Sequence, residues 1–351
     1  MIIELKNGQS SSVLSRLSDH DLEIYNIQNN GKHFIVTSGD ERQVDFKSIK
    51  SLSSVRNLIN GVENPYYFAS NDFKSNKTIV NVGNVAIGGK EIIIMAGPCA
   101  VENMEDTLQT ARLVKKAGTH IFRGGAFKPR TTPHNFQGTK EKGLEILAHA
   151  KKETGLPIIT EVMRETDIDL VSSYADILQI GSRNMTNSAL LKSLGKAKKP
   201  ILLKRSFSSG VKEFLKAAEF IIVNGNPNVI LCERGIMTFE TYTRFTLDIS
   251  AIVAIRELSH LPVIVDPSHA TGKPSFIPAM SKAAIAAGAD GLLIEVHVCP
   301  EKMIKPGDGF QALVPAQLKK LVEDIKPFAL AAGRQMSSTT NRGLEKADYS
   351  A

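Results

Sequence analysis

Four side chains of types that commonly bind metal ions follow the apolar segments EIIIMAG, PVIVDPS and GLLI. They are Cys99, His269, Glu295 and, in the loop beyond, Asp308. A thiolate, an imidazole and two carboxylates can hold one divalent cation, and this mixture of donors suits Mn, Fe, Co, Zn or Cu. Taken alone, Cys99 is better explained as an inert buried thiol and His269 as a hydrogen-bonded loop residue. We predict a metal site because the four residues would lie together at neighbouring strand ends.

Basic side chains follow most of the other apolar segments. They are Arg123, Lys128, Arg183, Lys204, Arg205 and Arg234, whereas the segment PIIT is followed by Glu161. The stretch IFRGGAFKPRTT alone carries three cations and no acidic residue. An isolated Lys or Arg usually belongs to a solvated surface, but a ring of them offers the forked and point-charge contacts that a phosphate and a carboxylate need. We therefore predict a small, phosphorylated, anionic substrate.

Eight short apolar segments would position these residues. They are EIIIMAG, HIFRGG, PIITEV, ILQIGS, PILLKRS, VILCERG, PVIVDPSH and GLLIEVH. Stretches with helical apolar spacing lie between them, and strands that alternate with helices in this way predict an α/β fold, a (β/α)8 TIM barrel. A doubly wound open sheet is the alternative, but the sequence lacks a GxGxxG turn. In a barrel all strands end on one face, where catalytic residues collect.

Residues 1–70 have the pattern of a separate small unit. MIIEL, EIYNIQ, KHFIVTS and PYYFAS are typical of strands, and SVLSRL is typical of a short helix. Apolar residues recur at helical spacing over residues 49–59, which predicts a second helix. The resulting order βαββαβ predicts a small ferredoxin-like α+β domain.

The remaining boundaries follow from changes in composition. We expect a polar linker at 71–77 and the catalytic barrel over 78–333, preceded by a hairpin that turns at Gly83. Residues 334–351 contain few apolar side chains, so we expect a disordered tail.

The overall composition excludes several classes of protein. No apolar run of the 351 residues approaches the roughly 18 to 20 needed to span a membrane, and the first residues lack the order of a signal peptide. Cys99, Cys232 and Cys299 have no paired spacing, which favours a reducing, cytoplasmic location. The net charge of +7 is spread along the chain without a nucleic-acid-binding motif. We expect neither a membrane nor a nucleic-acid partner.

Six motifs together closely resemble those of the 3-deoxy-D-arabino-heptulosonate 7-phosphate (DAHP) synthases of the type I beta group. They are GPCAVE, FRGGAFKPRTT, QIGSRN, CERGIMTFE, DPSHATGK and IEVH, and the likeness covers residues 78 to about 333. The N-terminal unit resembles the regulatory domain of some members. The resemblance implies condensation of phosphoenolpyruvate with erythrose 4-phosphate and water, with release of phosphate, as the first step of the shikimate pathway.

The resemblance also implies a role for each residue. Cys99, His269, Glu295 and Asp308 would bind a divalent metal such as Mn, Fe, Co or Zn. Phosphoenolpyruvate would be bound by Arg123, Lys128, Ser182, Arg183, Lys204 and Arg234, and erythrose 4-phosphate by Arg130 and Thr131. Lys128 would donate a proton and Glu161 would orient the attacking water. A tyrosine or phenylalanine effector is expected at residues 1–70, together with a homo-oligomer, a tetramer being favoured.

Three alternative functions agree less well with the sequence. The 3-deoxy-D-manno-octulosonate 8-phosphate synthases share the barrel but take arabinose 5-phosphate and usually carry Ala-Asn-Arg where this chain has the Lys-Pro-Arg-Thr of residues 128–131. A Schiff-base aldolase acting through Lys204 would not need the metal donors. A noncatalytic sensor would not need charged groups at nearly every strand end.

Overall fold

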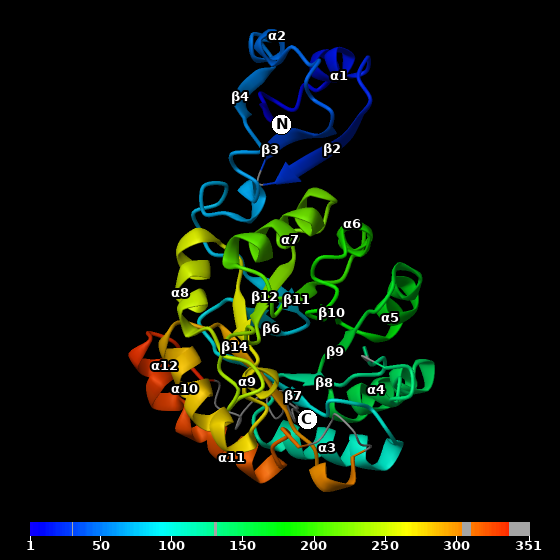
Figure 1. Ribbon diagram of the computed structural model, residues 1–351, viewed down its shortest axis with the longest axis vertical. Helices are drawn as coiled ribbons and strands as arrows, with labels where there is room; N and C mark the ends of the chain where they lie inside the picture. The colour runs from blue at the N-terminus through cyan, green and yellow to red at the C-terminus, as the bar shows by residue number, and fades with distance from the viewer. Residues whose placement is uncertain (30, 130–131, 304–309, 337–351) are drawn as a thin grey trace, which may run out of the picture.

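The computed structural model describes residues 1–29, 31–129, 132–303 and 310–336. Figure 1 shows a small N-terminal unit seated on a larger barrel. No helix in these described ranges is long and apolar enough to cross a membrane.

Eight parallel strands form a closed barrel, which confirms the predicted fold class. They are β7 (Ile93–Gly97), β8 (Ile121–Arg123), β9 (Ile158–Glu161), β10 (Ile177–Ile180), β11 (Ile201–Lys204), β12 (Val229–Glu233), β13 (Val263–Val265) and β14 (Gly291–Glu295). Each strand pairs with its neighbours in chain order, and β14 closes the ring by pairing with β7. The strands are almost entirely buried because helices cover their outer face and side chains fill the interior.

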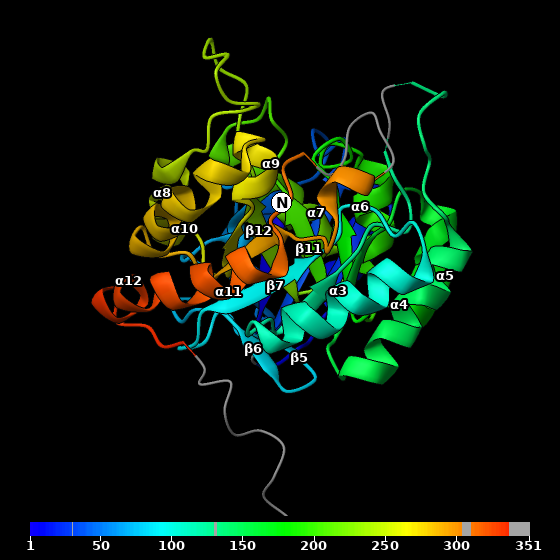
Figure 2. The same ribbon diagram turned by 90° about the horizontal axis from the view of Figure 1, so that it is seen from below.

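Helices surround the barrel (Figures 1 and 2). They are α3 (Met104–Lys116), α4 (Glu141–Thr154), α5 (Ile168–Tyr174), α6 (Ser188–Gly195), α7 (Val211–Val223), α8 (Ile249–Leu258), α9 (Pro267–Thr271), α10 (Ile277–Ala286), α11 (Pro315–Asp324) and α12 (Lys326–Ala331). Asn103, Asn187 and Asp248 each accept a backbone N–H at the start of a helix, as N-caps do.

A hairpin of β5 (Val80–Val82) and β6 (Val85–Ile87) closes one end of the barrel. It turns at Gly83, whose φ of +58° favours glycine, as the sequence predicted. Its apolar side chains pack in one cluster with barrel residues such as Ile93 and Ile121, near the starts of their strands. Figure 2 shows the hairpin at the end opposite the long loops.

The N-terminal unit has the predicted element order. It consists of β1 (Ile2–Leu5), α1 (Ser11–Leu17), β2 (Leu22–Asn29), β3 (Lys32–Gly39), α2 (Phe46–Lys50) and β4 (Val55–Ile59). The four strands form an antiparallel sheet in the order β2-β3-β1-β4. One face of the sheet packs on α1 and α2 through residues such as Ile3 and Ile35.

Two elements of this unit differ from their predictions. The expected helix over 49–59 ends near residue 50, and Val55–Ile59 forms a strand. Pairing with the open edge of β1 supplies its backbone hydrogen bonds, and this tertiary contact overrides a helical spacing that β-branched residues can also satisfy in a strand. The segment PYYFAS, expected as the fourth strand, forms the short 3-10 helix η1 (Tyr67–Ala69).

The segment around η1 connects the two units. Phe68 is fully buried and packs edge-on against Phe34 of the sheet, with ring centroids 5.3 Å apart. Its backbone N–H and that of Ala69 donate to the carboxylate of Glu219 on α7, at 3.0 and 2.9 Å. The Phe68 carbonyl lies 2.8 Å from His260 Nε2. The end of the predicted N-terminal domain is therefore also anchored to the barrel.

The start of the predicted tail is part of the fold. Arg334 forms an ion pair of 2.9 Å with Asp290 and donates to the carbonyl of Gly89 at 2.8 Å. The backbone N–H of Gln335 donates to Lys90 O at 2.9 Å. The expectation of disorder was thus wrong for residues 334–336, because their polar groups find partners on the barrel. Residues 337–351 lie outside the described residues.

Glu219 is expected to make stability depend on pH. Burial raises the pKa of its carboxyl to about 8, against the effect of the two backbone donors. In an unfolded chain this carboxyl has its ordinary pKa of 4.5, so between pH 4.5 and about 8 the folded state binds more protons than the unfolded state. The resulting stabilisation is complete below pH 4.5 and is lost as pH rises toward 8. We predict that Glu219→Gln, which stays neutral, gains roughly 2 to 4 kcal/mol relative to the parent over that interval.

Urea unfolding of both proteins at pH 5, 6.5 and 8 measures this difference. Glu213→Gln, the same exchange at an exposed position of α7, serves as the control. A stability difference between Glu219→Gln and the parent that stays constant with pH would contradict the prediction.

Candidate active site

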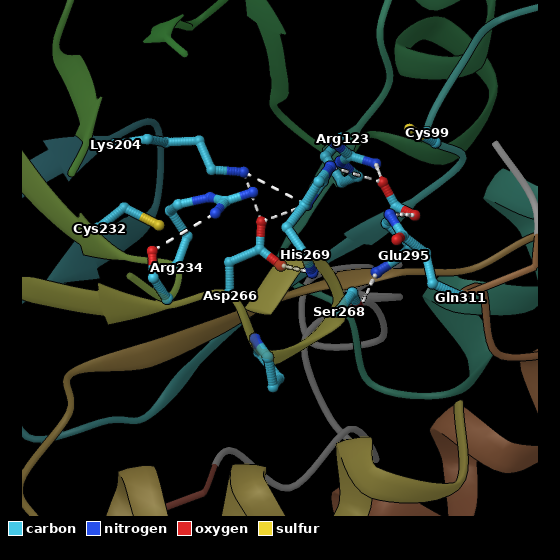
Figure 3. A network of polar contacts seen from close by, with 12 residues as sticks. Cys99, Arg123, Lys204, Cys232, Arg234, Asp266, Ser268, His269, Glu295 and Gln311 are labelled. Carbon is cyan, nitrogen blue, oxygen red and sulfur yellow. Dashed lines mark hydrogen bonds and ion pairs between the residues drawn. The ribbon is translucent and has the colours of Figure 1, made fainter. Parts of the chain in front are cut away.

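The carboxyl ends of the barrel strands surround one polar cavity of about 200 Å³. Its lining includes the predicted residues Cys99, Arg123, Lys128, Glu161, Ser182, Arg183, Lys204, Arg234 and His269. Glu295 is buried and lies beside His269 (Figure 3). Arg130, Thr131 and Asp308 lie outside the described residues, although Pro129 and Asn135 do line the cavity.

Three of the four predicted metal donors converge. Donor atoms of Cys99, His269 and Glu295 all lie within 4.8 Å of one another. They follow β7, occupy α9 and end β14, and these elements adjoin because β14 pairs with β7. His269 Nε2 lies 3.0 Å from Glu295 Oε1. This set of soft and hard donors fits a divalent transition-metal ion.

Asp266, which the sequence analysis did not assign to the site, fixes the histidine. Its Oδ2 lies 2.6 Å from His269 Nδ1, and its Oδ1 accepts the His269 backbone N–H at 2.9 Å. With Nδ1 held in this way, Nε2 faces the other donors, the arrangement typical of metal-binding histidines. The same carboxylate accepts from Lys204 Nζ. Burial opposes its ionisation, but the charges of His269 and Lys204 hold the pKa of Asp266 well below its ordinary value.

Two cations lie directly beside the donors. Arg123 Nη1 lies 3.3 Å from Glu295 Oε1, and Lys128 Nζ lies 2.8 Å from Cys99 Sγ. Burial works against ionisation of Glu295, but the neighbouring charges, led by that of His269, hold the pKa of its carboxyl well below the ordinary value. The glutamate is therefore available as an anionic ligand at neutral pH.

Arg234 has an open hydrogen-bonding position. Its buried Nε has no partner among the described residues, and its guanidinium lies 4.2 Å from the ring centroid of Phe245. Burial lowers the pKa of Arg234 to about 10, which leaves it protonated at neutral pH. A buried donor without a partner is costly, so this part of the cavity suits an anionic ligand.

Glu161 also faces the cavity with an unused oxygen. Its Oε1 has no partner among the described residues, and its Oε2 accepts from Gln179 at 3.3 Å. Burial raises the pKa of this carboxyl, although nearby cations partly oppose the shift. A side chain at Gly181 would overlap the Glu161 carboxylate, which explains why this turn needs glycine.

Arg205 does not belong to the ring of cavity cations. Its guanidinium pairs with Glu233 at 2.9 Å and with Asp248 at 3.0 Å, and it is absent from the cavity lining. Successive side chains point in opposite directions at a strand end, so Lys204 and Arg205 cannot both face the centre. Arg244 and Phe245, which the sequence analysis did not assign, do line the cavity.

Comparison with known proteins identifies close relatives. The family described as the DAHP synthetase I family matches residues 71–328. A phospho-2-dehydro-3-deoxyheptonate aldolase of Thermotoga maritima is 43% identical, and the match covers 95% of this chain and 99% of that protein. A 2-dehydro-3-deoxyphosphooctonate aldolase of Syntrophotalea carbinolica is 30% identical over 70% of this chain and 94% of that protein.

Solved structures agree with these matches. A crystal structure of the Thermotoga maritima aldolase (DAHP synthase) has a TM-score of 0.76 at 41% identity, covering 96% of this chain and 99% of that one. A truncated form of 3-deoxy-D-arabino-heptulosonate 7-phosphate synthase from the same organism has a TM-score of 0.72 at 44% identity and covers 78% of this chain and 99% of that one.

Loss of the Asp266 contacts to His269 is expected to weaken metal binding. We expect Asp266→Asn to raise the dissociation constant for Co²⁺ about 10- to 100-fold, because the amide no longer fixes the His269 ring as the carboxylate does. Titration of the metal-free protein with Co²⁺ measures the change, with Asp324→Asn on α11 as the control. Equal affinities of the parent and Asp266→Asn would rule out this role.

Proposed function

This chain belongs to the DAHP synthetase I family, and from that premise we propose how its residues catalyse the reaction of a DAHP synthase. The enzyme condenses phosphoenolpyruvate with erythrose 4-phosphate and water to give 3-deoxy-D-arabino-heptulosonate 7-phosphate and inorganic phosphate. The observation that carries this function is the match to the Thermotoga maritima enzyme at 43% identity over 95% of this chain. The octulosonate relatives match a smaller part of the chain at lower identity, so that alternative is not favoured.

We assign the metal to Cys99, His269 and Glu295, with Asp308 as the fourth ligand. When bound, a divalent cation such as Mn, Fe, Co or Zn supplies Lewis-acid polarisation of a carbonyl oxygen. The convergence of the three described donors and the Asp266 contact to His269 support this assignment. The donor set does not select one metal.

Phosphoenolpyruvate is bound by cations that line the cavity. Arg183, Lys204 and Arg234 hold its phosphate, together with backbone N–H groups at Ser182, and Arg123 shares its carboxylate with Lys204. The Nε of Arg234, which has no partner among the described residues, supports this assignment. A dianionic phosphate would complete the hydrogen bonding of the forked guanidinium groups.

Erythrose 4-phosphate is assigned to the Lys-Pro-Arg-Thr segment of residues 128–131. Arg130 and Thr131 hold its phosphate in this proposal, and the position of Pro129 and Asn135 in the cavity lining agrees with it. The aldehyde carbon then lies within reach of C3 of phosphoenolpyruvate.

Lys128 and Glu161 are assigned to proton transfer and to orientation of the attacking water. C3 attacks the aldehyde carbon while water adds at C2, and the phosphate then leaves with the C2–oxygen electron pair. Lys128 donates a proton to the aldehyde oxygen as the new bond forms. Glu161 orients the water through Oε1, which has no partner among the described residues, and burial raises the pKa of this carboxyl.

Several further assignments stay predictions. They are a regulatory role of residues 1–70, a tyrosine or phenylalanine effector, a homo-oligomer with a tetramer favoured, and a cytoplasmic location.

Phosphate release tests the function directly. We expect rapid release from phosphoenolpyruvate with erythrose 4-phosphate and far slower release with arabinose 5-phosphate.

The activity is also expected to depend on the metal. It should vanish in chelator and return with Mn²⁺, and Cys99→Ser is expected to lower both metal affinity and activity because a hydroxyl is a poor ligand. Full activity in chelator, with no metal in the sample, would refute the metal assignment.

Gly181→Ala tests the position of Glu161. The added methyl group would displace the carboxylate, so we expect turnover to fall about 10- to 100-fold while metal affinity stays unchanged. Gly61→Ala is a suitable control because the nearest atom to its new methyl group would be 3.8 Å away. Unchanged turnover in Gly181→Ala would exclude Glu161 from catalysis.

A further inference from the structure

Three side chains form a hydrogen-bonded chain that leads from the cavity to the back of Glu295. Arg244 Nη1 donates to Gln311 Oε1 at 3.1 Å, and Gln311 Nε2 donates to Glu295 Oε2 at 2.7 Å. Gln311 is fully buried, and Figure 3 shows it against the Glu295 carboxylate. Arg244 lines the cavity, so the chain connects a cavity-facing cation to a proposed metal ligand.

The two neighbours of Gln311 determine the direction of its amide. A guanidinium can only donate hydrogen bonds and an ionised carboxylate can only accept them. The amide oxygen must therefore face Arg244 and the amide nitrogen must face Glu295. A flipped amide would place two donors together at one end and two acceptors together at the other.

The Gln311 amide also gives the two carboxylate oxygens of Glu295 different partners. Glu295 Oε2 accepts from Gln311, whereas Oε1 lies near His269 and Arg123, at 3.0 and 3.3 Å. One oxygen is thus left facing the donor cluster. Without this hydrogen bond, rotation of the carboxylate would be opposed only by the contacts of Oε1 among the described residues.

Backbone hydrogen bonds fix the segments that carry Gln311 and Arg244. Leu313, two residues after Gln311, donates its N–H to Glu295 O at 2.9 Å and accepts from His297 N at 3.0 Å. The backbone N–H of Arg244 donates to Thr271 O at 3.0 Å, at the end of the helix that carries His269. The loops after β12 and β14 are therefore fixed to the same elements as the metal donors.

We propose that Gln311 is a positioning residue that orients Glu295 toward the bound metal, and that Arg244 acts through Gln311 by fixing its amide. This inference rests on the proposed metal-dependent function. Neither residue contacts the metal in this proposal, and both determine how well a ligand is presented to it.

Metal affinity of the purified full-length chain is the appropriate measurement. Co²⁺ is titrated into the metal-free protein, and thiolate-to-cobalt absorption reports binding at Cys99 independently of turnover. We expect Gln311→Glu, which sets two carboxylates side by side, to raise the dissociation constant about 10- to 100-fold. Gln311→Met, which removes the hydrogen bonds at similar volume, is expected to raise it about 10-fold.

Arg244 distinguishes a positioning role from a merely structural one. Its side chain is exposed, so Arg244→Met is expected to fold and to raise the dissociation constant about 3- to 10-fold. Because Arg244 acts through Gln311, the same substitution should have no further effect in the Gln311→Met background. Gln109→Glu, at an exposed position of α3, is the control and is expected to leave Co²⁺ affinity unchanged.

Failure of the positioning role and failure of the proposed metal-dependent function give different results. Parent affinity in folded Gln311→Glu and Gln311→Met, or full additivity of the Arg244 and Gln311 effects, would overturn the positioning role while leaving the proposed function intact. If Gln311→Glu does not fold, Gln311→Met and Arg244→Met still decide the question. A parent protein that binds no Co²⁺ would overturn the metal-dependent function, and the positioning role with it.

Discussion

The pairing of β14 with β7 is the contact on which the active site depends. It sets Glu295 opposite Gly97, residues that are far apart in the chain, and so places the Glu295 carboxylate close to Cys99 and His269. Gly97 permits the close approach of β8 because a Cβ atom at this position would overlap the backbone of Arg123. The close approach of β8 brings the Arg123 guanidinium within 3.3 Å of Glu295. Barrel closure therefore assembles both the ligands and the charge that accompanies them.

Burial of the four central charges is possible because each is paired with an opposite charge. Glu295 and Asp266 are almost fully buried, as are Arg123 and Lys204, and the structure alternates acid and base through the cluster. An unpaired charge in such a place would cost several kcal/mol. Three of these groups, Glu295, Arg123 and Lys204, are also assigned to metal and substrate, so binding would exchange partners and would not create charge in an apolar site.

The sequence was sufficient for features that repeat or that have local chemistry. Eight apolar segments predicted eight strands, and the residues that follow them predicted most of the cavity lining, because a parallel barrel leaves few other places for them. The strand at residues 55–59 was missed because its pairing partner is distant in sequence. Arg205 was assigned to the cavity, and Asp266, Arg244 and Gln311 were not assigned to the site, since their roles depend on which neighbour each side chain meets. The places of Arg130, Thr131 and Asp308 stay predictions.

The contacts of Arg334 and Gln335 have a topological consequence. The barrel region begins near Lys90 and ends near Gln335, and these two positions are joined by a backbone hydrogen bond of 2.9 Å. The barrel is thus close to a ring in chain connectivity as well as in space. A circular permutant that linked these ends and opened an exposed loop elsewhere would keep every strand pair of the eight-stranded barrel, although residues 1–89 lie outside the linked segment. The N-terminal unit is then an attachment at the seam of this ring, so a domain could be gained or lost there without disturbing the strands that hold the catalytic groups.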